Sequence, residues 1–364
     1  MFCENLLAGK RLPEIWEKES GPWEIRRKEV TDILQRELFG YQPADPEEIS
    51  FEEVENSDMN SSFCAGKAVG KEIAIHTKLN GKEFTFPIYA AIPKGEGKFP
   101  FFVHINFRDN VPDKYMPTEE LIDNGFAVFS FGYQDVTSDD DDFTNGLAGL
   151  IYEGRERVGS ECGKIPMWSW AASRVMDYCQ SLDCLDFNKS AVIGHSRLGK
   201  TALFTGMLDE RFRFVISNNS GFAGAAFARN REDREQGKSF CSVEFCCNHH
   251  MQWFAPNYRK YINNEDAMPY DHHFLVAASA PRYGYVGRAV EDVWSDPDTE
   301  YLSCCAAGEV YERMGYKGFI HPDRLPQPLD VFGEGRVGYH MRYGQHYLSR
   351  EDWNLYMKFI RSKE

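Results

Sequence analysis

The chain has 364 residues, with a formal net charge of −15 at pH 7, 42% hydrophobic residues and 14% aromatic residues. This excess of acidic side chains excludes nucleic acid and anionic membranes as electrostatic partners, because both carry negative charge themselves. The length fits one large domain with insertions or two domains, and no apolar stretch is long enough to predict a transmembrane helix.

The N-terminal sequence and the cysteines indicate the cellular compartment. Residues 1–10 lack the basic start and the apolar core of a signal peptide. The ten cysteines are scattered, and adjacent pairs such as Cys304-Cys305 fall in apolar helical sequence. Free buried thiols are typical of a reducing compartment. The sequence therefore predicts a cytoplasmic protein, or a secreted one if a leader peptide has been removed.

The first part of the chain combines helical and β-like patterns. Residues 1–48 look helical, and Pro22 and Gly40 mark the start and the end of a helix within them. Two β-like segments follow at residues 72–76 and 84–92, and a hairpin signal lies between them.

Buried strands and helices alternate along the rest of the chain. Such a β-α-β rhythm is typical of a mostly parallel sheet with helices on both faces. Residues 222–274 break the rhythm, since they are polar and aromatic, and they predict a lid-like insertion over the C-terminal edge of the sheet. The predicted strands are residues 99–106, 126–131, 190–193, 214–219, 277–286 and 336–342, and the predicted helices are residues 118–124, 167–182, 201–208, 299–314 and 351–360.

Clusters of possible metal ligands do not have the spacing of a metal site. The run Asp139–Asp142 lacks the alternating pattern of a calcium loop, so we expect a solvent-exposed loop there. Pairs such as Cys246-Cys247 and His249-His250 form no Cys-x-x-Cys or His-x-x-x-His frame, and adjacent residues cannot easily bind one metal. The sequence therefore predicts neither a metal site nor a cofactor.

A Gly-x-Ser motif, Gly194-His195-Ser196, lies where a short apolar strand gives way to a helix. Such a turn is typical of a nucleophile elbow, which lifts the serine hydroxyl clear of both elements and places it at the N-terminus of the helix. The second glycine of the usual motif comes one position late, because Leu198 stands in its place and Gly199 follows. The alternative interpretation is an ordinary strand–helix turn with a serine cap.

Two late stretches carry the other groups that a serine nucleophile requires, a base and a carboxylate that orients it. Residues 290–297 follow one predicted strand and contain three acids, and residues 338–346 end the last strand and contain two histidines. Acid before histidine, on loops after late strands, is the order found in α/β-hydrolases.

These motifs resemble those of the glucuronoyl esterases, a carbohydrate esterase family with the α/β-hydrolase fold. Residues 194–200 fit the family pattern Gly-x-Ser-Arg-x-Gly-Lys, including its late glycine, and the resemblance is dense from about Pro166 to the C-terminus. We therefore expect a three-layer αβα sandwich with a mostly parallel central sheet. It would form a single domain of residues 1–364, with an N-terminal helical extension over about 1–48 and a lid-like insertion over about 222–274. Further matching stretches are residues 253–258, 268–273, 280–282, 291–297, 338–346 and 352–353.

The resemblance implies hydrolysis of esters between glucuronic acid, often 4-O-methylated on xylan, and an alcohol such as those in lignin. The expected substrate is a small-molecule or oligosaccharide ester. Two alternatives stay open. One is an acetyl-xylan or other carbohydrate esterase, and the other is a non-catalytic sugar-binding relative that has lost a member of the triad.

The resemblance also implies the roles of three residues in the reaction. Ser196 matches the nucleophile and His346 matches the base. His340 is the alternative base, although it lies in strand-like sequence. Arg197 matches a residue that helps to stabilise the oxyanion, where a cation is most effective because negative charge develops there.

The identity of the triad acid depends on the branch of the family. One branch carries a glutamate in the turn after the strand that follows the elbow, but this chain has Asn219 there, which is not a carboxylate. Another branch uses an aspartate two residues before a tryptophan, which matches Asp292. Glu291 and Asp296 are the alternatives.

Three further residues match positions that bind the sugar. Lys200 matches a lysine that contacts the sugar hydroxyls, and Trp294 matches a tryptophan that contacts the uronic acid. Glu244 lies where the family carries polar sugar-binding residues, although the spacing differs.

Overall fold

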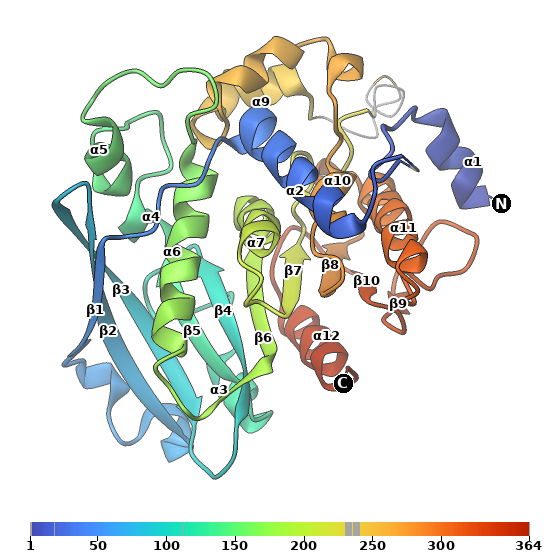
Figure 1. The fold of residues 1–364 in the computed structure, drawn as a ribbon. Coiled ribbons are helices and arrows are strands. Elements are labelled where there is room, and N and C mark those ends of the chain that lie inside the picture. Colours follow the sequence, from blue (N-terminus) through green and yellow to red (C-terminus); the bar gives the residue numbers. More distant parts are fainter. Residues whose placement is uncertain (1, 18, 112, 230–234, 236–240, 364) are drawn as a thin grey trace.

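In the computed structural model, which describes residues 2–17, 19–111, 113–229, 235 and 241–363, the strands form one mixed sheet (Figure 1). The strands are β1 (Glu48–Val54), β2 (Ala68–Leu79), β3 (Lys82–Pro93), β4 (Phe99–Asn106), β5 (Ala127–Gly132), β6 (Leu185–His195), β7 (Phe214–Asn218), β8 (Tyr283–Ala289), β9 (Val331–Phe332) and β10 (Val337–Arg342).

The order of the described strands across the sheet is β1-β2-β3-β5-β4-β6-β7-β8-β10-β9. The central strands from β5 to β10 in this order pair in parallel. β1, β2 and β3 pair antiparallel at one side, and β9 does so at the other edge. The predicted α/β fold with a mostly parallel sheet is confirmed.

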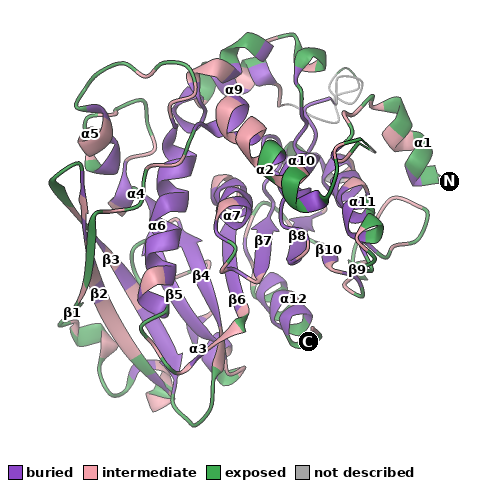
Figure 2. Cartoon of the chain, viewed as in Figure 1, coloured by how far each residue is buried: buried purple, intermediate pink, exposed green. Residues whose placement is uncertain are grey.

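Helices cover both faces of this sheet. Successive side chains of β4 show why, because Phe101 and Val103 belong to one apolar core and Phe102 belongs to the other. Figure 2 shows the central strands buried between the layers. On one face lie α2 (Trp23–Leu34), α5 (Gly146–Tyr152), α6 (Lys164–Cys179), α7 (Arg197–Leu208), α10 (His273–Ala277) and α11 (Pro297–Arg313), and on the other lie α3 (Thr118–Asp123) and α12 (Arg350–Arg361).

Three further α-helices of the described residues also contribute to the first of these cores, through residues such as Cys3, Val136 and Val243. They are α1 (Phe2–Gly9), α4 (Tyr133–Val136) and α9 (Val243–His249), and α9 belongs to the long segment between β7 and β8. Among the described residues, no helix combines the length and the apolar character that crossing a bilayer requires.

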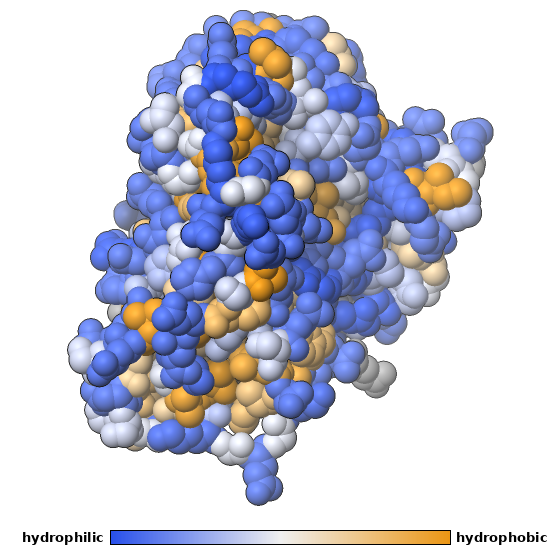
Figure 3. Space-filling model, turned by 60° about the vertical axis from the view of Figure 1, so that its left-hand side comes forward, coloured by the Kyte–Doolittle hydropathy of each residue, from blue (hydrophilic) through white to orange (hydrophobic). Residues whose placement is uncertain are grey.

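Several element boundaries differ from the sequence prediction. The strand predicted over residues 277–286 begins only at Tyr283, because Ala277 ends α10 and residues 278–282, which include Pro281, form turns. β1 was not predicted, since nearly all of its residues are exposed and it has no buried face. The surface seen from the side on which β1 lies carries gathered hydrophobic residues among hydrophilic ones (Figure 3).

The end of the first predicted helix also has a local cause. The α-helix ends at Leu34 and continues as a π-helix over Gln35–Phe39. Gly40 then ends it with φ 92°, and a Cβ atom there would lie 2.3 Å from Cys162 Cα. Only glycine fits both the left-handed backbone and this close approach.

His340, the alternative base, belongs to a buried polar network between β10 and α12. Its Nε2 atom lies 2.7 Å from Asp352 Oδ1, and Arg342 Nε donates to both carboxylate oxygens at 2.9 and 2.8 Å. Burial raises the pKa of Asp352, but the hydrogen bond and charge of His340 and the charge of Arg342 outweigh it and hold this pKa below its ordinary value. His340 thus joins a strand to a helix.

We predict that Asp352→Asn lowers the free energy of unfolding by about 3–5 kcal/mol, because it leaves the buried Arg342 without its counter-charge. Urea unfolding at neutral pH measures this. Glu351→Gln is the matched control, because Glu351 is exposed in the same helical turn, and we expect a change of less than about 0.5 kcal/mol.

The loss of stability in Asp352→Asn should also depend on pH in a defined direction. A depressed carboxylate pKa contributes stability above the unfolded-state pKa of about 3.9, and this contribution is lost as the pH falls through the folded-state value. The stability difference between wild type and Asp352→Asn should therefore shrink below about pH 4. A difference independent of pH would contradict the ionised network.

Candidate active site

Ser196 lies at the sharp turn between β6 and α7, and its backbone is strained. Its φ is 59° and its ψ is −125°, a conformation that side-chain-bearing residues rarely adopt. The Ser196 N–H group donates to the carbonyl of Asn218, at the end of β7, at 2.9 Å. This geometry is that of a nucleophile elbow, in which the hydroxyl projects from the C-terminal edge of the sheet.

Two glycines make this turn possible, and they account for the late glycine of the motif. A Cβ atom on Gly194 would lie 2.1 Å from the carbonyl oxygen of Leu198. A Cβ atom on Gly199 would lie 3.1 Å from both the Asn218 carbonyl oxygen and Ser220 Cβ. Gly199 therefore allows the first turn of α7 to approach the end of β7, and the Leu198 side chain is free to enter the core.

His346 and Asp292 come together from two separate loops. His346 follows β10 and Asp292 follows β8, and the His346 Nδ1 atom lies 2.6 Å from Asp292 Oδ2. The carboxylate is nearly buried, with 3% of its side chain exposed, whereas 45% of the His346 side chain is exposed. A proton on Nδ1 donated to the carboxylate leaves Nε2 as the atom that can accept a proton.

Asp292 also receives hydrogen bonds from two neighbours that the sequence analysis did not assign to it. Asn219 Nδ2 donates to Oδ2 at 2.7 Å, and Ser295 Oγ donates to the same oxygen at 2.8 Å. Burial raises the pKa of Asp292, but the bond to His346 and these two donors lower it to about 2. Asn219 therefore contacts the carboxylate from the position where one branch of relatives would carry an acid.

The alternative acids take other places. Glu291 is exposed. Asp296 is buried at the N-terminus of α11, where its side chain accepts from Thr299 N–H at 3.3 Å and caps the helix. Of the three acids, Asp292 is the one that contacts His346.

His195, the middle residue of the elbow motif, packs beneath His346. The two ring centroids lie 4.4 Å apart, and His195 Nδ1 lies 2.6 Å from Asn218 Oδ1. Burial and the neighbouring His346 lower the pKa of His195 to about 3, so this ring is neutral at physiological pH. A neutral ring supports the imidazole of His346 without adding a second charge.

A buried ion pair lies behind the acid. Arg288 of β8 donates to the carbonyls of Ala289 at 2.6 Å and of Asp292 at 2.9 Å. Glu300 of α11 accepts from Gly221 N–H at 2.8 Å and lies 3.6 Å from Arg288. Burial raises the pKa of Glu300 to about 7 although Arg288 opposes it. The pair thus ties the loop after β7 to the loop that carries Asp292.

A cavity of about 420 Å³ opens beside the serine. The segment between β7 and β8 forms one of its walls, with Phe245 and Cys246 from α9. Glu244, on the same helix, is exposed and is not among the residues that line the cavity. The other predicted site residues all line it: Ser196, Arg197, Lys200, Asp292, Trp294 and His346.

Arg197 is held in place by an acid that the sequence analysis assigned to a solvent-exposed loop. It forms an ion pair with Asp139, whose side chain is only 4% exposed, so that prediction is wrong for Asp139. Asp139 also accepts from Trp253 Nε1 at 2.6 Å, and the guanidinium lies 4.9 Å from the centre of the Trp253 ring. No local pattern distinguishes Asp139 from the acids that follow it in the run.

Lys200 and an aromatic pair form the cationic side of the cavity. Lys200 is buried, donates to the carbonyl of Ser220 and lies 5.8 Å above the Trp253 ring. Its burial lowers its pKa. His250 stacks on Trp253 at 4.1 Å with 3° between the planes. Trp294 is 52% exposed on the rim.

This arrangement can carry out acyl transfer. It combines a serine at a strained elbow, a histidine oriented by a buried carboxylate, and a guanidinium next to the serine. These are the groups that such a reaction uses as nucleophile, general base and stabiliser of an oxyanion.

Comparison with known proteins agrees with this chemistry. A family model described as glucuronyl esterase of fungi matches residues 75–315. Carbohydrate esterase MZ0003, from an unknown prokaryotic organism, is 34% identical over 243 residues, which are 66% of this chain and 54% of that protein. A 4-O-methyl-glucuronoyl methylesterase of Schizophyllum commune is 30% identical over 301 residues, which are 80% of this chain and 69% of that protein.

A solved glucuronoyl esterase from Solibacter usitatus superposes with a TM-score of 0.84 at 28% identity, and the match covers 97% of both chains. The match thus spans nearly the whole length of that structure but just over half of the length of MZ0003.

We predict that Asp139→Asn lowers the kcat/KM for an activated ester such as p-nitrophenyl acetate by about 10-fold. Arg197 is then less firmly oriented, and removing an oxyanion donor outright costs about 10²–10³-fold. Asp140→Asn is the control, since Asp140 is exposed in the same run. Equal rates for the two variants would show that Asp139 does not orient Arg197.

Proposed function

Because the chain belongs to the glucuronoyl esterase family, we propose that it hydrolyses esters between glucuronic acid, including its 4-O-methyl form, and an alcohol. The observation that carries this proposal is the shared cavity of Ser196, His346 and Asp292, with a 2.6 Å hydrogen bond between the last two. A non-catalytic sugar-binding relative would lack one of these three groups.

In the proposed reaction, Ser196 Oγ attacks the ester carbonyl carbon while His346 Nε2 takes the hydroxyl proton. Asp292 holds the imidazole in the required tautomer and stabilises its protonated form. The tetrahedral intermediate carries its negative charge on the former carbonyl oxygen, close to Arg197. The intermediate collapses to an acyl-serine, and the alcohol leaves with the proton from His346. Water then attacks the acyl-serine by the same route and releases glucuronate.

We further propose that Lys200 and Trp294 recognise the sugar. The ammonium group of Lys200 can donate to hydroxyls of the sugar ring without taking part in the acyl chemistry. Trp294, which is half exposed on the rim, offers a flat apolar surface to the sugar ring. An acetyl group would need none of these contacts, so they favour a uronate over an acetyl ester.

Two features of organisation belong to the same proposal. Residues of about 222–274, of which 230–234 and 236–240 lie outside the described residues, would act as a lid-like insertion on a single hydrolase domain, supported by Phe245 and Trp253 in the cavity wall. The N-terminal residues up to about 48 would be an extension of that domain.

All ten cysteines are free, which supports a reducing cytoplasmic location, with small-molecule or oligosaccharide esters as substrates.

We predict that Asp292→Asn lowers kcat about 10⁴-fold, because an amide favours the wrong tautomer of His346. Glu291→Gln is the matched control and should keep nearly wild-type turnover, since Glu291 is exposed. Ser196→Ala sets the baseline for complete loss. Steady-state hydrolysis of benzyl glucuronate compares the three, and an inactive Glu291→Gln beside an active Asp292→Asn would reverse the assignment of the acid.

We predict that Lys200→Met weakens hydrolysis of benzyl glucuronate by about 1.5–3 kcal/mol in kcat/KM, the scale of a hydrogen bond to a charged group. Methionine keeps the apolar stem of the side chain and removes only the ammonium. Hydrolysis of p-nitrophenyl acetate should hardly change, because that substrate has no sugar to bind.

The two substrates separate the interpretations of this variant. Equal losses on both would mean that Lys200 supports the elbow through Ser220. Wild-type enzyme that prefers acetylated xylo-oligosaccharide to benzyl glucuronate would replace the proposed activity with that of an acetyl-xylan esterase.

A further inference from the structure

Three side chains of metal-binding type meet outside the cavity of Ser196, where the N-terminal helix meets α11. Cys3 lies on α1, Cys305 lies on α11, and His321 lies in the loop after α11. The two sulfur atoms and a ring nitrogen of His321 all lie within 4.8 Å of one another. Both cysteines are buried, with 3% and 8% of their surfaces exposed. We propose that Cys3, Cys305 and His321 bind a zinc ion that fastens α1 to α11.

The ligand set suits zinc in kind and in geometry. Thiolate sulfur and imidazole nitrogen are the donors of tetrahedral zinc sites, with Zn–S of about 2.3 Å and Zn–N of about 2.0 Å. Ligand atoms around such an ion lie roughly 3.3–3.8 Å apart. Small side-chain rotations therefore bring the three atoms to bonding distance, and a water molecule completes the tetrahedron.

Charge balance also favours a divalent ion at this place. Binding removes one proton from each thiol, and both protons pass to the solvent. Two thiolates and a neutral imidazole then balance the two positive charges of zinc, so the ion and its three ligands together carry no net charge. A neutral site avoids most of the desolvation penalty that an isolated buried ion would meet.

Neighbouring groups hold the three ligands in place. Tyr301 Oη lies 2.8 Å from His321 Nδ1, and the carbonyl of Pro322 lies 2.9 Å from the same nitrogen. The carboxylate of Asp323 accepts from the N–H groups of Phe2 at 2.7 Å and Cys3 at 3.0 Å, which fixes the start of α1. Supporting hydrogen bonds of this kind orient metal ligands in proteins.

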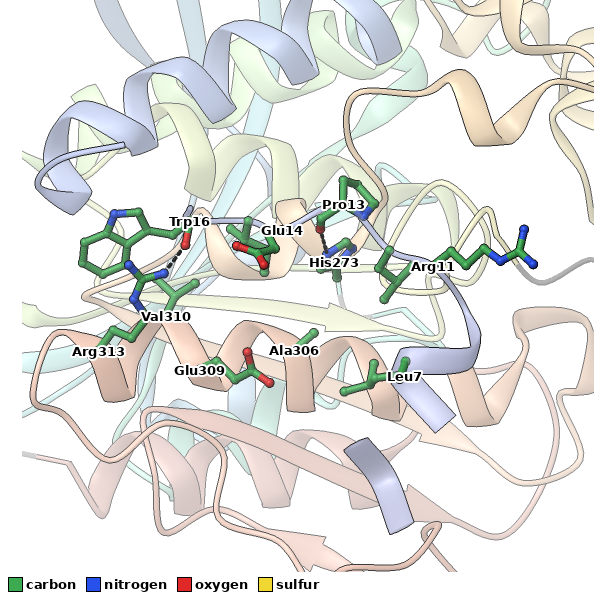
Figure 4. A pocket seen from close by; sticks show the side chains of 13 residues that line it. Leu7, Arg11, Pro13, Glu14, Trp16, His273, Ala306, Glu309, Val310 and Arg313 are labelled. Atoms are coloured by element: carbon green, nitrogen blue, oxygen red, sulfur yellow. Dashed lines mark hydrogen bonds between the residues drawn. The ribbon is translucent and has the colours of Figure 1, made fainter. Parts of the chain in front are cut away.

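The packing of α1 shows what such an ion would contribute. A pocket of about 570 Å³ separates residues 7–16 from α11 (Figure 4). Figure 4 shows Leu7 at one end of this pocket, Ala306 near its middle, and Arg313 beside Trp16 at the other end. A helix of eight residues is marginal by itself, and here an open pocket replaces part of its packing surface. A bond through zinc would supply the missing attachment.

Zinc binding to the full chain tests the proposal. The reduced, chelator-treated protein is titrated with Zn²⁺ against a chromophoric chelator, and with Co²⁺ to record the thiolate-to-cobalt charge-transfer band. We expect one ion per chain and a cobalt spectrum typical of tetrahedral sulfur ligation. Cys3→Ser, Cys305→Ser and His321→Gln each remove a ligand and should weaken zinc binding by more than the roughly 10–100-fold that loss of a supporting hydrogen bond costs.

Cys184→Ser is the matched control, because it removes a free cysteine elsewhere in the chain. It should leave zinc binding and the cobalt spectrum unchanged. His321 is only partly buried and lies in a loop, so His321→Gln should fold normally. Loss of zinc binding in this variant would therefore report the loss of a ligand and not misfolding. Wild-type protein that binds no zinc, or binding that persists in His321→Gln and Cys3→Ser, would overturn the proposal.

Proteolysis gives a second readout that does not depend on the spectrum. Lys10 and Arg11 follow α1 directly and offer trypsin sites. Zinc should slow cleavage there severalfold in wild type and in Cys184→Ser, but not in Cys305→Ser. Equal cleavage with and without zinc in wild type would show that no ion fastens α1.

Discussion

The hydrogen bonds to the carboxylate of Asp292 determine the geometry of the catalytic cavity. His346, Asn219 and Ser295 all donate to the same oxygen, and they come from the loops after β10, β7 and β8. Three loops from different parts of the sequence are thus joined at one atom. A buried carboxylate tolerates this position because donors replace the water that it loses. The carboxylate therefore stays ionised in the pH range where His346 would act as the proposed base.

On the cationic side of the cavity, the buried positive charges likewise need polar partners to replace water. Arg197 and Lys200 occupy the first turn of α7, and each would be costly to place there without an acceptor. Asp139 supplies one acceptor and the Ser220 carbonyl the other, while the face of Trp253 lies beneath both cations. The two groups are therefore fixed before any substrate arrives, which is the condition for electrostatic stabilisation without reorganisation.

Local patterns in the sequence were enough to predict the sheet and the catalytic elbow. Alternating strands and helices predict a parallel sheet by their periodicity, and the motif around Ser196 predicts its turn by its glycines. The partners of these residues could not be predicted, because they are set by distant packing. Asp139 looks like its neighbours in an acidic run, and the pair of Arg288 and Glu300 has no spacing that sequence could reveal.

The same limit applies to Cys3, Cys305 and His321, which come from opposite ends of the chain and meet only in the folded protein. Sequence rules for metal sites require short spacings, so they miss ligands that lie on separate elements. Glu244 illustrates the reverse case: its position resembles that of a sugar-binding residue, but it lies on the exposed side of α9, while its neighbour Phe245 faces the cavity.

The exposure of His346 and Trp294 has a consequence for selectivity. About half of each side chain faces water, whereas Lys200 and Asp292 are buried. In the proposed reaction, the sugar would lie against Lys200 and Trp294, and the alcohol would leave past the exposed imidazole of His346 into bulk solvent. Such a cleft discriminates strongly among acids and weakly among alcohols, so leaving groups of very different size and polarity would be released from the same site.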